Sequence, residues 1–392
     1  MQNTPNICIV NELQIEENRG GVQTVSYLLK DKFEALEIPV YSVHLEQKRN
    51  KYKNEYILPD TENIDSEENH KFLYNIIVNN KISIILFQGY LGELMKLCVD
   101  IRKTLPVKLI YTYHRDPEAG IKEYDDYKER IINNTKSHTI KLIKGIVLEL
   151  KRPVFSHNCK ERIKRGLAKY EMEYIDAFIS LDEHYTNFIR SLYPKKYYHK
   201  FHTIINPIKT TCQNNNRKEK YVLFIARHTY QKRLDRLLYI WSETSNKFPE
   251  WKLIVVGNGD YHNQYIKIAD EQNLKNIVFV GEQPANQYYR TCSIICMTSS
   301  HEGLPMTLIE AQSYGCVPIA YDSFSSARRI IINNYNGLLV KPFVKKKYRK
   351  ALHTLMENED LRNKFAQNGI EYIKQFDINI IIKEWISLIE NL

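Results

Sequence analysis

Residues 299–323 read SSHEGLPMTLIEAQSYGCVPIAYDS, and this stretch decides the predicted fold. Two short β-rich apolar runs, CSIICMTSS before it and VPIAY within its end, flank an apolar segment of helical character. Pro305 suits the first position of that helix, where its missing N–H costs nothing, and Gly315 suits the position just past the last turn. The stretch therefore predicts a strand, a tight loop, a helix and a second strand, which form one βαβ unit.

Two acids with seven residues between them lie at the start of this helix, Glu302 in the loop and Glu310 on the helix. A loop that leads into a helix has unpaired backbone N–H groups and the positive end of the helix dipole, so it attracts phosphate. Helical side chains lean toward the N-terminus, so Glu310 can reach a ligand lying there. Carboxylates also accept hydrogen bonds from the vicinal hydroxyls of a ribose or hexose. The pattern suits a nucleotide-sugar, while solvated ends of a surface helix are the alternative.

The segment HEGLPMTLIEAQSYGCVPIAYD resembles the signature of family-4 glycosyltransferases, which are retaining enzymes with the two-domain GT-B fold. It is most similar to the branch that builds bacterial cell-surface polysaccharides such as capsule and lipopolysaccharide. The resemblance extends over most of the second half of the chain and only patchily over the first half. It implies an α/β chain with two Rossmann-like domains whose parallel sheets face each other across a cleft.

With 392 residues the chain is long enough for two domains with full cores. We expect residues 1–205 to form an N-terminal, acceptor-binding domain, followed by a linker at residues 206–218, which are rich in Asn and Lys. Residues 219–375 would form the C-terminal, nucleotide-sugar-binding domain. Residues 376–392 carry apolar side chains at helical spacing, and the resemblance implies that this helix crosses back to the first domain.

The resemblance assigns the main donor contacts position by position. It implies that Glu302 contacts the donor sugar and that Glu310 contacts the ribose. Arg227, at the end of a predicted strand, and Lys232, at the start of a predicted helix, match the phosphate-binding Arg and Lys of the family. Two such cations can converge on one diphosphate, and an ordinary surface pair is the alternative. Arg233 stands where many family members have glycine, which adds charge.

Further donor contacts are expected from loops that follow other predicted strands. Gly20 and Gly21 open a helix, and glycine there lets a ligand approach the backbone, although a merely structural turn is the alternative. Gly257 belongs to a turn whose G-x-G lacks the third glycine of a dinucleotide fingerprint. The remaining expected donor contacts lie after Gly281 and around the start of the signature helix: Gln283, Gly303, Leu304, Pro305, Met306 and Thr307.

His114 lies at the end of a further buried strand, within VKLIYTYHRD. The C-terminal end of a parallel strand faces the ligand crevice of an open α/β sheet. A hydrogen-bonded core or loop histidine is the alternative, but the resemblance implies that this histidine lies beside the reacting sugar. We expect it to form a hydrogen bond to the sugar or to stabilise charge, and not to act as a nucleophile. The predicted catalytic residues are therefore His114, Glu302, Arg227 and Lys232.

No metal or cofactor is expected. The sequence has no D-x-D motif, the usual metal-binding pair of the other main glycosyltransferase fold, and no cluster with metal-ligand spacing. The departing diphosphate then needs another source of positive charge, which Arg227, Lys232 and the helix start at residues 303–307 can supply. The seven cysteines lack disulfide or zinc spacing and are typical of buried thiols in a cytosolic protein.

The formal net charge of +10 indicates an anionic partner, such as nucleic acid, a membrane surface or an anionic substrate. Residues 141–169 are strongly basic with interleaved apolar residues, a pattern typical of a segment that docks on anionic lipid or of a solvated helix face. No signal peptide or membrane span is predicted. We expect a cytoplasmic protein, and a peripheral one on the inner face of the cytoplasmic membrane where residues 141–169 bind lipid.

The sequence thus predicts a retaining glycosyltransferase. It would move a hexose or N-acetylhexosamine from a nucleotide-sugar, with a UDP-sugar favoured, to a growing surface glycan or lipid-linked acceptor. Two other classes stay open. A GT-B sugar-nucleotide epimerase or hydrolase would share the architecture, and a basic nucleic-acid-binding protein would explain the charge. No recognised nucleic-acid-binding motif is present, so no nucleic-acid partner is expected.

Overall fold

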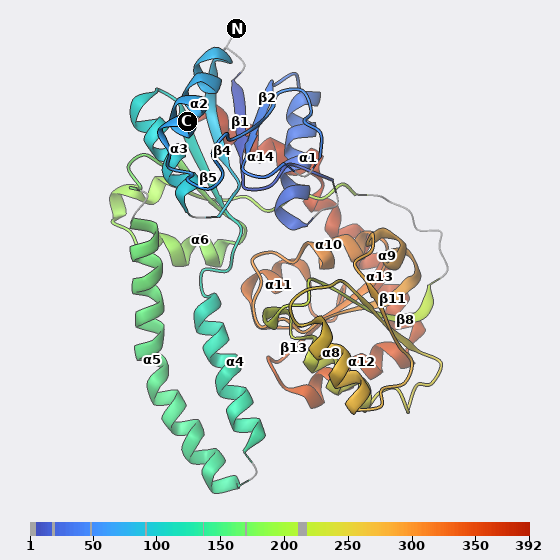
Figure 1. The fold of residues 1–392 in the computed structure, drawn as a ribbon. Helices are drawn as coiled ribbons and strands as arrows, with labels where there is room; N and C mark the ends of the chain where they lie inside the picture. Colours follow the sequence, from blue (N-terminus) through green and yellow to red (C-terminus); the bar gives the residue numbers. More distant parts are fainter. Residues whose placement is uncertain are drawn as a thin grey trace. The chain divides into compact units, whose positions relative to one another are not determined.

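The computed structural model describes residues 5–17, 20–47, 49–90, 92–135, 137–168, 171–210 and 218–392. The chain divides into two compact units. The first combines Met1–Pro117, His157–Lys209 and Phe376–Leu392, and the second combines Glu118–Ser156 and Thr210–Gln375. Each unit is built on one parallel β-sheet with helices packed on it (Figure 1).

The first unit contains a seven-stranded sheet with the order β3-β2-β1-β4-β5-β6-β7. Its strands are β1 (Asn6–Val10), β2 (Val40–His44), β3 (Glu55–Ile57), β4 (Ile82–Phe87), β5 (Lys108–Tyr113), β6 (Ala177–Ser180) and β7 (Phe201–Thr203). Its helices are α1 (Gly21–Ala35), α2 (Glu67–Asn79), α3 (Glu93–Thr104), α6 (Glu183–Arg190) and α14 (Ile378–Glu390). The strand order reverses between β1 and β4, which is the point where open α/β sheets bind ligands beyond the carboxyl ends of the strands.

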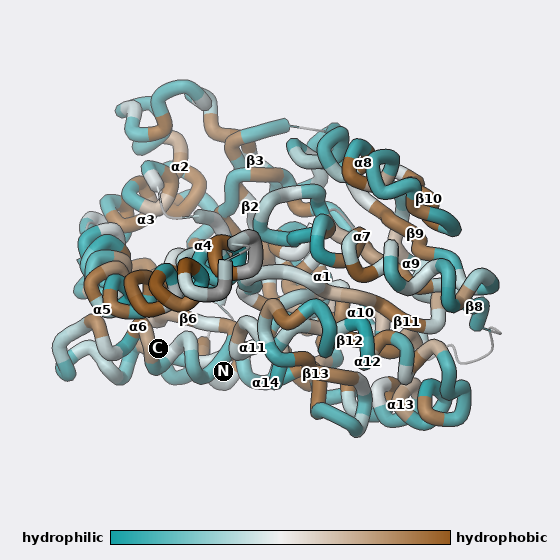
Figure 2. Tube along the Cα trace, turned by 90° about the horizontal axis from the view of Figure 1, so that it is seen from below, coloured by the Kyte–Doolittle hydropathy of each residue, from teal (hydrophilic) through white to brown (hydrophobic). Residues whose placement is uncertain are grey.

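The central strands of this sheet are apolar on both faces because helices cover both sides. The run ISIILF in β4 and the buried residues of β1 illustrate the continuous hydrophobic pattern of such strands. Side chains of β1, β4 and β5 form one core with the inner faces of α2 and α3. The apolar segments are the brown stretches of the tube in Figure 2.

The second unit contains a six-stranded parallel sheet with the order β10-β9-β8-β11-β12-β13. Its strands are β8 (Glu219–Ile225), β9 (Lys252–Val256), β10 (Ile277–Gly281), β11 (Cys292–Met297), β12 (Val317–Tyr321) and β13 (Leu338–Val340). The helices that follow these strands are α7 (Leu234–Ser242), α8 (His262–Glu271), α9 (Asn286–Thr291), α10 (Met306–Ser313), α11 (Ser325–Ile330), α12 (Lys345–Glu357) and α13 (Glu359–Tyr372). The order reverses between β8 and β11, so their carboxyl ends mark the expected ligand site.

The βαβ unit predicted from residues 299–323 is present as β11, α10 and β12. The two strands are neighbours and parallel, with Ile295 opposite Pro318. Helix α10 begins at Met306, so Pro305 is the N-cap and not the first helical residue. Gly315 follows the helix with φ 72°, the left-handed conformation in which glycine is favoured.

The boundaries of the units differ from the predicted division of the chain. Residues 118–156 lie within the predicted N-terminal domain of residues 1–205, but they cluster with the second unit. Side chains of residues 118–156 form ion pairs with the second unit, described below, which no local sequence pattern reveals. Phe376–Leu392 groups with the first unit, where α14 packs on α1 and the Ile378 N–H donates to the Ile208 carbonyl. Of the expected linker, residues 211–217 lie outside the described part of the chain.

Between β5 and β6 the chain forms two helices, α4 (Ala119–Asn134) and α5 (His138–Ala168). The basic segment predicted at residues 141–169 is part of α5, except that Lys169 lies outside the described residues. Arg152 of α5 forms an ion pair with Asp125 of α4, with a 2.7 Å contact. Among the described helices, none combines the length and apolarity that a bilayer span requires.

Candidate functional site

The loops after β8 and β11 lie side by side at the switch point of the six-stranded sheet. The backbone N–H of Ser300 donates to the carbonyl of Gln231 at 2.9 Å. The hydroxyl of Thr298 donates to the carbonyl of Arg233 at 2.9 Å, and Arg236 donates back to the carbonyl of Thr298 at 3.2 Å. These bonds join two loops that are about 70 residues apart in sequence, and they hold Lys232 beside Glu302.

Lys232 and Glu302 form the centre of the candidate site. The ammonium Nζ of Lys232 lies 2.7 Å and 2.8 Å from the two carboxylate oxygens of Glu302. Glu302 is only 5% exposed, and Gln231 also donates to its Oε2 at 3.3 Å. A nearly buried carboxylate with two donors has a fixed orientation, so this geometry positions Glu302 beyond the carboxyl end of β11.

Arg227 lies two residues beyond the end of β8, on the same edge of the sheet. Its guanidinium has no hydrogen-bond or ion-pair partner among the residues that the structure describes, so it is available for an anion. Lys232 does not start a helix as predicted. It ends a short 3₁₀ turn, Tyr230–Lys232, and α7 begins two residues later. Arg233 lies between them with φ 53°, a left-handed conformation that glycine adopts at no steric cost. This conformation fits the glycine that the family resemblance places at this position in many members.

The start of α10 and the second acid, Glu310, follow Glu302 in sequence and belong to the same βαβ unit. Leu304 and Met306 are buried, while Gly303 and Thr307 are partly exposed at the helix start. Glu310 accepts a hydrogen bond from the Tyr289 hydroxyl at 2.9 Å. Burial raises the pKa of Glu310, and the hydrogen bond from Tyr289 opposes that rise. Tyr289 was not predicted, since nothing in the sequence connects α9 with α10.

Two of the predicted donor contacts, Gly257 and Gln283, lie on loops other than those that carry Lys232 and Glu302. A Cβ on Gly257, whose φ is 121°, would lie 2.0 Å from the carbonyl oxygen of Ala226. Glycine is therefore required there for packing of two loops, whether or not a ligand binds. Gln283 is exposed and lines an open hollow with Asn286 and Arg290 after β10.

His114 lies in the first unit, immediately after β5, beside the switch point of the seven-stranded sheet. Its Nε2 lies 2.5 Å from Oε1 of Gln88, a fully buried residue that follows β4. Burial lowers the pKa of His114 to about 4, so the imidazole is neutral near pH 7. His114 Nδ1 and Gln88 Nε2 are buried and have no hydrogen-bond partner within the described part of the chain. These two groups each keep an unused hydrogen-bonding capacity.

Gly20 and Gly21 are at the start of α1 in the first unit. Gly20 is the N-cap with φ 103°, a conformation that side chains rarely adopt, and Gly21 is the first helical residue. The carbonyl of Gly20 accepts the N–H of Thr24 at 3.0 Å. The two glycines therefore begin a helix, as predicted. Both follow β1 at the carboxyl edge of the sheet.

Helix α4 contributes charged residues that the sequence did not predict. Asp126 is fully buried and forms ion pairs with Arg233 and Arg236. Glu123 bonds His301 with 3.1 Å between Oε1 and Nε2. Both contacts lie within the second unit and join residues more than 100 positions apart, so no local motif could reveal them.

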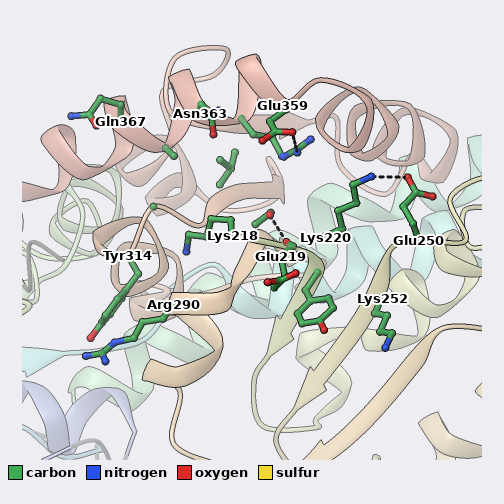
Figure 3. Close-up of a pocket in the computed structure, with 16 residues that line it drawn as sticks. Lys218, Glu219, Lys220, Glu250, Lys252, Arg290, Tyr314, Glu359, Asn363 and Gln367 are labelled. Atoms are coloured by element: carbon green, nitrogen blue, oxygen red, sulfur yellow. Dashed lines mark hydrogen bonds and ion pairs between the residues drawn. The ribbon is translucent and has the colours of Figure 1, made fainter. Parts of the chain in front are cut away.

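A further hollow of the second unit lies at the opposite ends of its strands. A cavity of about 770 Å³ lies at the amino ends of β8 and β9, lined by Lys218, Lys220, Lys252, Arg290 and Arg362 together with acids such as Glu250 and Glu359 (Figure 3). Lys220 is paired with Glu250 at 3.4 Å. Ligands of parallel sheets bind at the carboxyl ends, so this cavity does not belong to the candidate site.

One group of described residues has metal-ligand geometry, Asp65, His70 and Asp100 in the first unit. Lys96 already forms an ion pair with Asp65, and its ammonium occupies the position of a cation there. The six described cysteines are all buried and unpaired by disulfides, while Cys212 lies outside the described residues.

Residues 209–372 match the family model described as Glycosyl transferases group 1. The solved structure of Anabaena Alr3699/HepE in complex with UDP and glucose has a TM-score of 0.74 to this chain at 12% identity, covering 99% of this chain and 100% of that chain. Such an identity establishes the fold alone, and this fold is GT-B. The chain therefore has the GT-B fold, and residues 209–372 are similar to the group 1 glycosyl transferases.

Curated relatives agree with this class. The amylovoran biosynthesis glycosyltransferase AmsD of Erwinia amylovora is 33% identical over 171 residues, which are 43% of this chain and 48% of AmsD. A Campylobacter jejuni N-acetyl-D-galactosaminyltransferase, named for a diNAcBac-PP-undecaprenol glycan, is 24% identical over 236 residues, 59% of this chain and 64% of the relative. The chain thus spans about half the length of AmsD and somewhat more of the second relative.

Proposed function

We propose that this protein is a retaining glycosyltransferase that transfers a hexose or N-acetylhexosamine from a UDP-sugar to a growing surface glycan or lipid-linked acceptor. The observation that carries the proposal is the contact of Lys232 with Glu302 at the switch point of a group 1 glycosyl transferase sheet. The names of AmsD and the C. jejuni relative support the polysaccharide and lipid-linked acceptor, and UDP in the HepE structure supports the donor.

In this proposal the donor diphosphate lies at the start of α10, where Lys232 and Arg227 neutralise it. The first-turn N–H groups of α10 add to the positive potential. Glu302 accepts hydrogen bonds from the donor sugar, and Glu310 accepts them from the ribose. Charge builds up on the departing diphosphate in the transition state, so fixed cations and N–H donors there accelerate departure.

The ion pair of Lys232 and Glu302 changes when the donor binds. Both oxygens of Glu302 accept hydrogen bonds from the Lys232 ammonium, which competes with a sugar hydroxyl for them. A diphosphate carries more negative charge than one carboxylate and competes for the ammonium. Its arrival draws Lys232 toward phosphate and leaves Glu302 to accept from the sugar, so the two halves of the donor are recognised together.

The acceptor side of the proposal uses the carboxyl edge of the first unit. His114 is neutral near pH 7, so its contribution is a hydrogen bond to a sugar hydroxyl and not a positive charge. Gly20 and Gly21 leave room for the donor phosphates at the start of α1. The placement of the two sheets across a common cleft stays a prediction, as does the absence of a metal requirement.

Helix α5 fits a protein that works on lipid-linked glycans in the cytoplasm. Large apolar side chains recur every four residues and are exposed, Leu142 by 60%, Ile146 by 53%, Leu150 by 74% and Val154 by 65%. Lysines 141, 144 and 151 interleave with them. An apolar stripe with flanking cations binds anionic lipid, and co-sedimentation with phosphatidylglycerol vesicles but not phosphatidylcholine vesicles tests this peripheral attachment.

The central test is transfer from UDP-glucose, UDP-galactose and their N-acetyl analogues to lipid-linked and glycan acceptors, by the purified protein. Glu302→Ala should lower transfer by at least about 10²-fold, because the contact with the reacting sugar is lost. Glu271→Ala, which changes an exposed acid at the end of α8, is the matched control and should leave transfer unaffected. Full activity of the Glu302→Ala variant would refute the site. Release of free sugar and nucleotide without any transfer would favour a hydrolase or epimerase instead.

A further inference from the structure

Helix α4 brings a buried carboxylate to the loop that carries the two donor-site cations. Asp126 is 0% exposed, and it forms ion pairs with Arg233 at the end of that loop and with Arg236 in the first turn of α7. The hydroxyl of Tyr230, which is also in the loop, donates to Asp126 Oδ2 at 3.3 Å. One carboxylate of α4 therefore contacts three side chains that lie within four residues of Lys232.

Arg233 needs this support because of its backbone. Its φ of 53° and ψ of 45° place it in the left-handed region, which is unfavourable for a residue with a Cβ. Asp126 contacts one side of the guanidinium. On the other side, the two carboxylate oxygens of Asp235 accept hydrogen bonds from the guanidinium at 2.8 and 2.9 Å. The two carboxylates thus stabilise the conformation that ends the loop one residue after Lys232.

The same pairing decides which cations remain for a ligand. Arg233 is 6% exposed and bonded to two carboxylates, so it is not available to a phosphate. Arg227 has no partner among the described residues, and Lys232 has a partner that a diphosphate can replace. A second contact from α4, Glu123 with His301, lies beside Glu302 on the neighbouring loop.

We propose that Asp126 is a positioning residue for Lys232. By holding Arg233 in the left-handed conformation and neutralising Arg233 and Arg236, it fixes the loop after β8 so that the Lys232 ammonium lies where a nucleotide diphosphate binds. The ligand in this statement rests on the proposed function, whereas the role of Asp126 in ordering the loop does not. Helix α4 is in this sense part of the donor site, although it lies between β5 and β6 in the chain.

A double-mutant cycle on the full-length protein tests the proposal, with UDP as the probe and calorimetry as the measurement. Asp126→Asn should weaken UDP binding about tenfold. In a Lys232→Ala background, the same change should weaken binding by less than about twofold, because Asp126 acts through Lys232. Asp125→Asn, which alters the neighbouring ion pair with Arg152, is the matched control and should leave UDP binding unchanged.

Equal losses in both backgrounds would mean that Asp126 only stabilises the fold, and this outcome overturns the proposal. If Asp126→Asn does not fold, Asp126→Glu keeps the charge but displaces it, and the same cycle applies. Hydrogen exchange of the backbone amides of residues 228–233 gives a readout without ligand. Faster exchange there in the Asp126 variant but not in the Asp125 variant supports the proposal, and unchanged exchange contradicts it. A wild-type protein that does not bind UDP refutes the proposed function, and the exchange result then decides the role of Asp126 separately.

Discussion

The carboxyl edges of the two sheets carry different chemistry. At the edge of the six-stranded sheet the buried acids Glu302 and Asp126 are paired with Lys232 and Arg233, while the exposed Arg227 has no partner among the described residues. At the edge of the seven-stranded sheet, His114 is neutral near pH 7, and both His114 and Gln88 have a buried polar atom without a partner among the described residues. Both edges are switch points of parallel sheets, so the topology is the same and only the side chains differ.

The difference is informative because each kind of edge suits a different ligand. A buried charge without a partner is costly, so the buried charges of an anion site are paired before the anion arrives, whereas an exposed cation such as Arg227 can stay solvated. An unpaired neutral donor or acceptor costs less and is satisfied by a hydroxyl. The charged edge therefore suits a diphosphate and the neutral edge suits a sugar hydroxyl, which is the division of labour in the proposed transfer.

The largest expected loss of transfer comes from removing Lys232, the cation at the charged edge. Lys232→Ala removes the positive charge beside the departing diphosphate, so transfer should fall by roughly 10²- to 10³-fold. Affinity for UDP, measured by calorimetry, should fall at least severalfold. Lys220→Ala is the control, since Lys220 is a lysine of the same sheet paired with Glu250 at its other end. Unchanged UDP affinity in the Lys232 variant would exclude this residue from the site.

Replacing His114 at the neutral edge should reduce transfer by a smaller factor and should leave the affinity for UDP nearly unchanged. His114→Ala removes a hydrogen bond to a sugar hydroxyl, so transfer should fall by about 10- to 100-fold. Affinity for UDP should stay within about twofold, because the histidine contributes no charge near pH 7. His114→Asn keeps a donor and should recover part of the activity. A large loss of UDP affinity in either variant would contradict the assignment of His114 to the hydroxyl side.

The last expected effect is on stability as a function of pH. The pKa of His114 is lowered to about 4 in the folded protein, whereas it is about 6.5 in an unfolded chain. Between these values the unfolded state binds more protons, so the free energy of unfolding decreases as the pH falls from about 6.5 to 4. His228, with a pKa also lowered to about 4 by burial and by His262, contributes with the same sign.

Urea unfolding of the wild type and of His114→Asn between pH 7 and 4.5 measures this effect. The variant should lose less stability over that range than the wild type, by about 1 to 3 kcal/mol. The two proteins should differ little in slope above pH 7, where the histidine is neutral in both states. Identical pH dependence would show that the environment of His114 does not favour the neutral imidazole.

Much of the fold follows from the sequence alone. The βαβ unit around α10 is marked by local signals, an apolar strand, Pro305 before the helix and Gly315 after it, and each acts on its own neighbours. The rows of apolar residues in β1, β5, β8 and β9 likewise predict buried parallel strands. Glu302 and Glu310 were found because they lie in that one unit.

Other parts of the site depend on residues that are distant in sequence. The predicted helix start at Lys232 was wrong, because the left-handed backbone at Arg233 delays α7 and is stabilised by Asp126 from α4. The predicted first domain of residues 1–205 included residues 118–156, which group with the second unit in the structure. Gly257 has a packing requirement set by Ala226, which belongs to another loop.

The sequence by itself determined the strands, the helices and the acids of the signature unit, because local spacing and backbone preferences decide these. Only the tertiary structure decided which charges are paired and which are free. An ion pair needs two side chains within about 4 Å, and the chain brings Asp126 to Arg233 across 107 positions by folding alone. No periodicity or motif records such a contact.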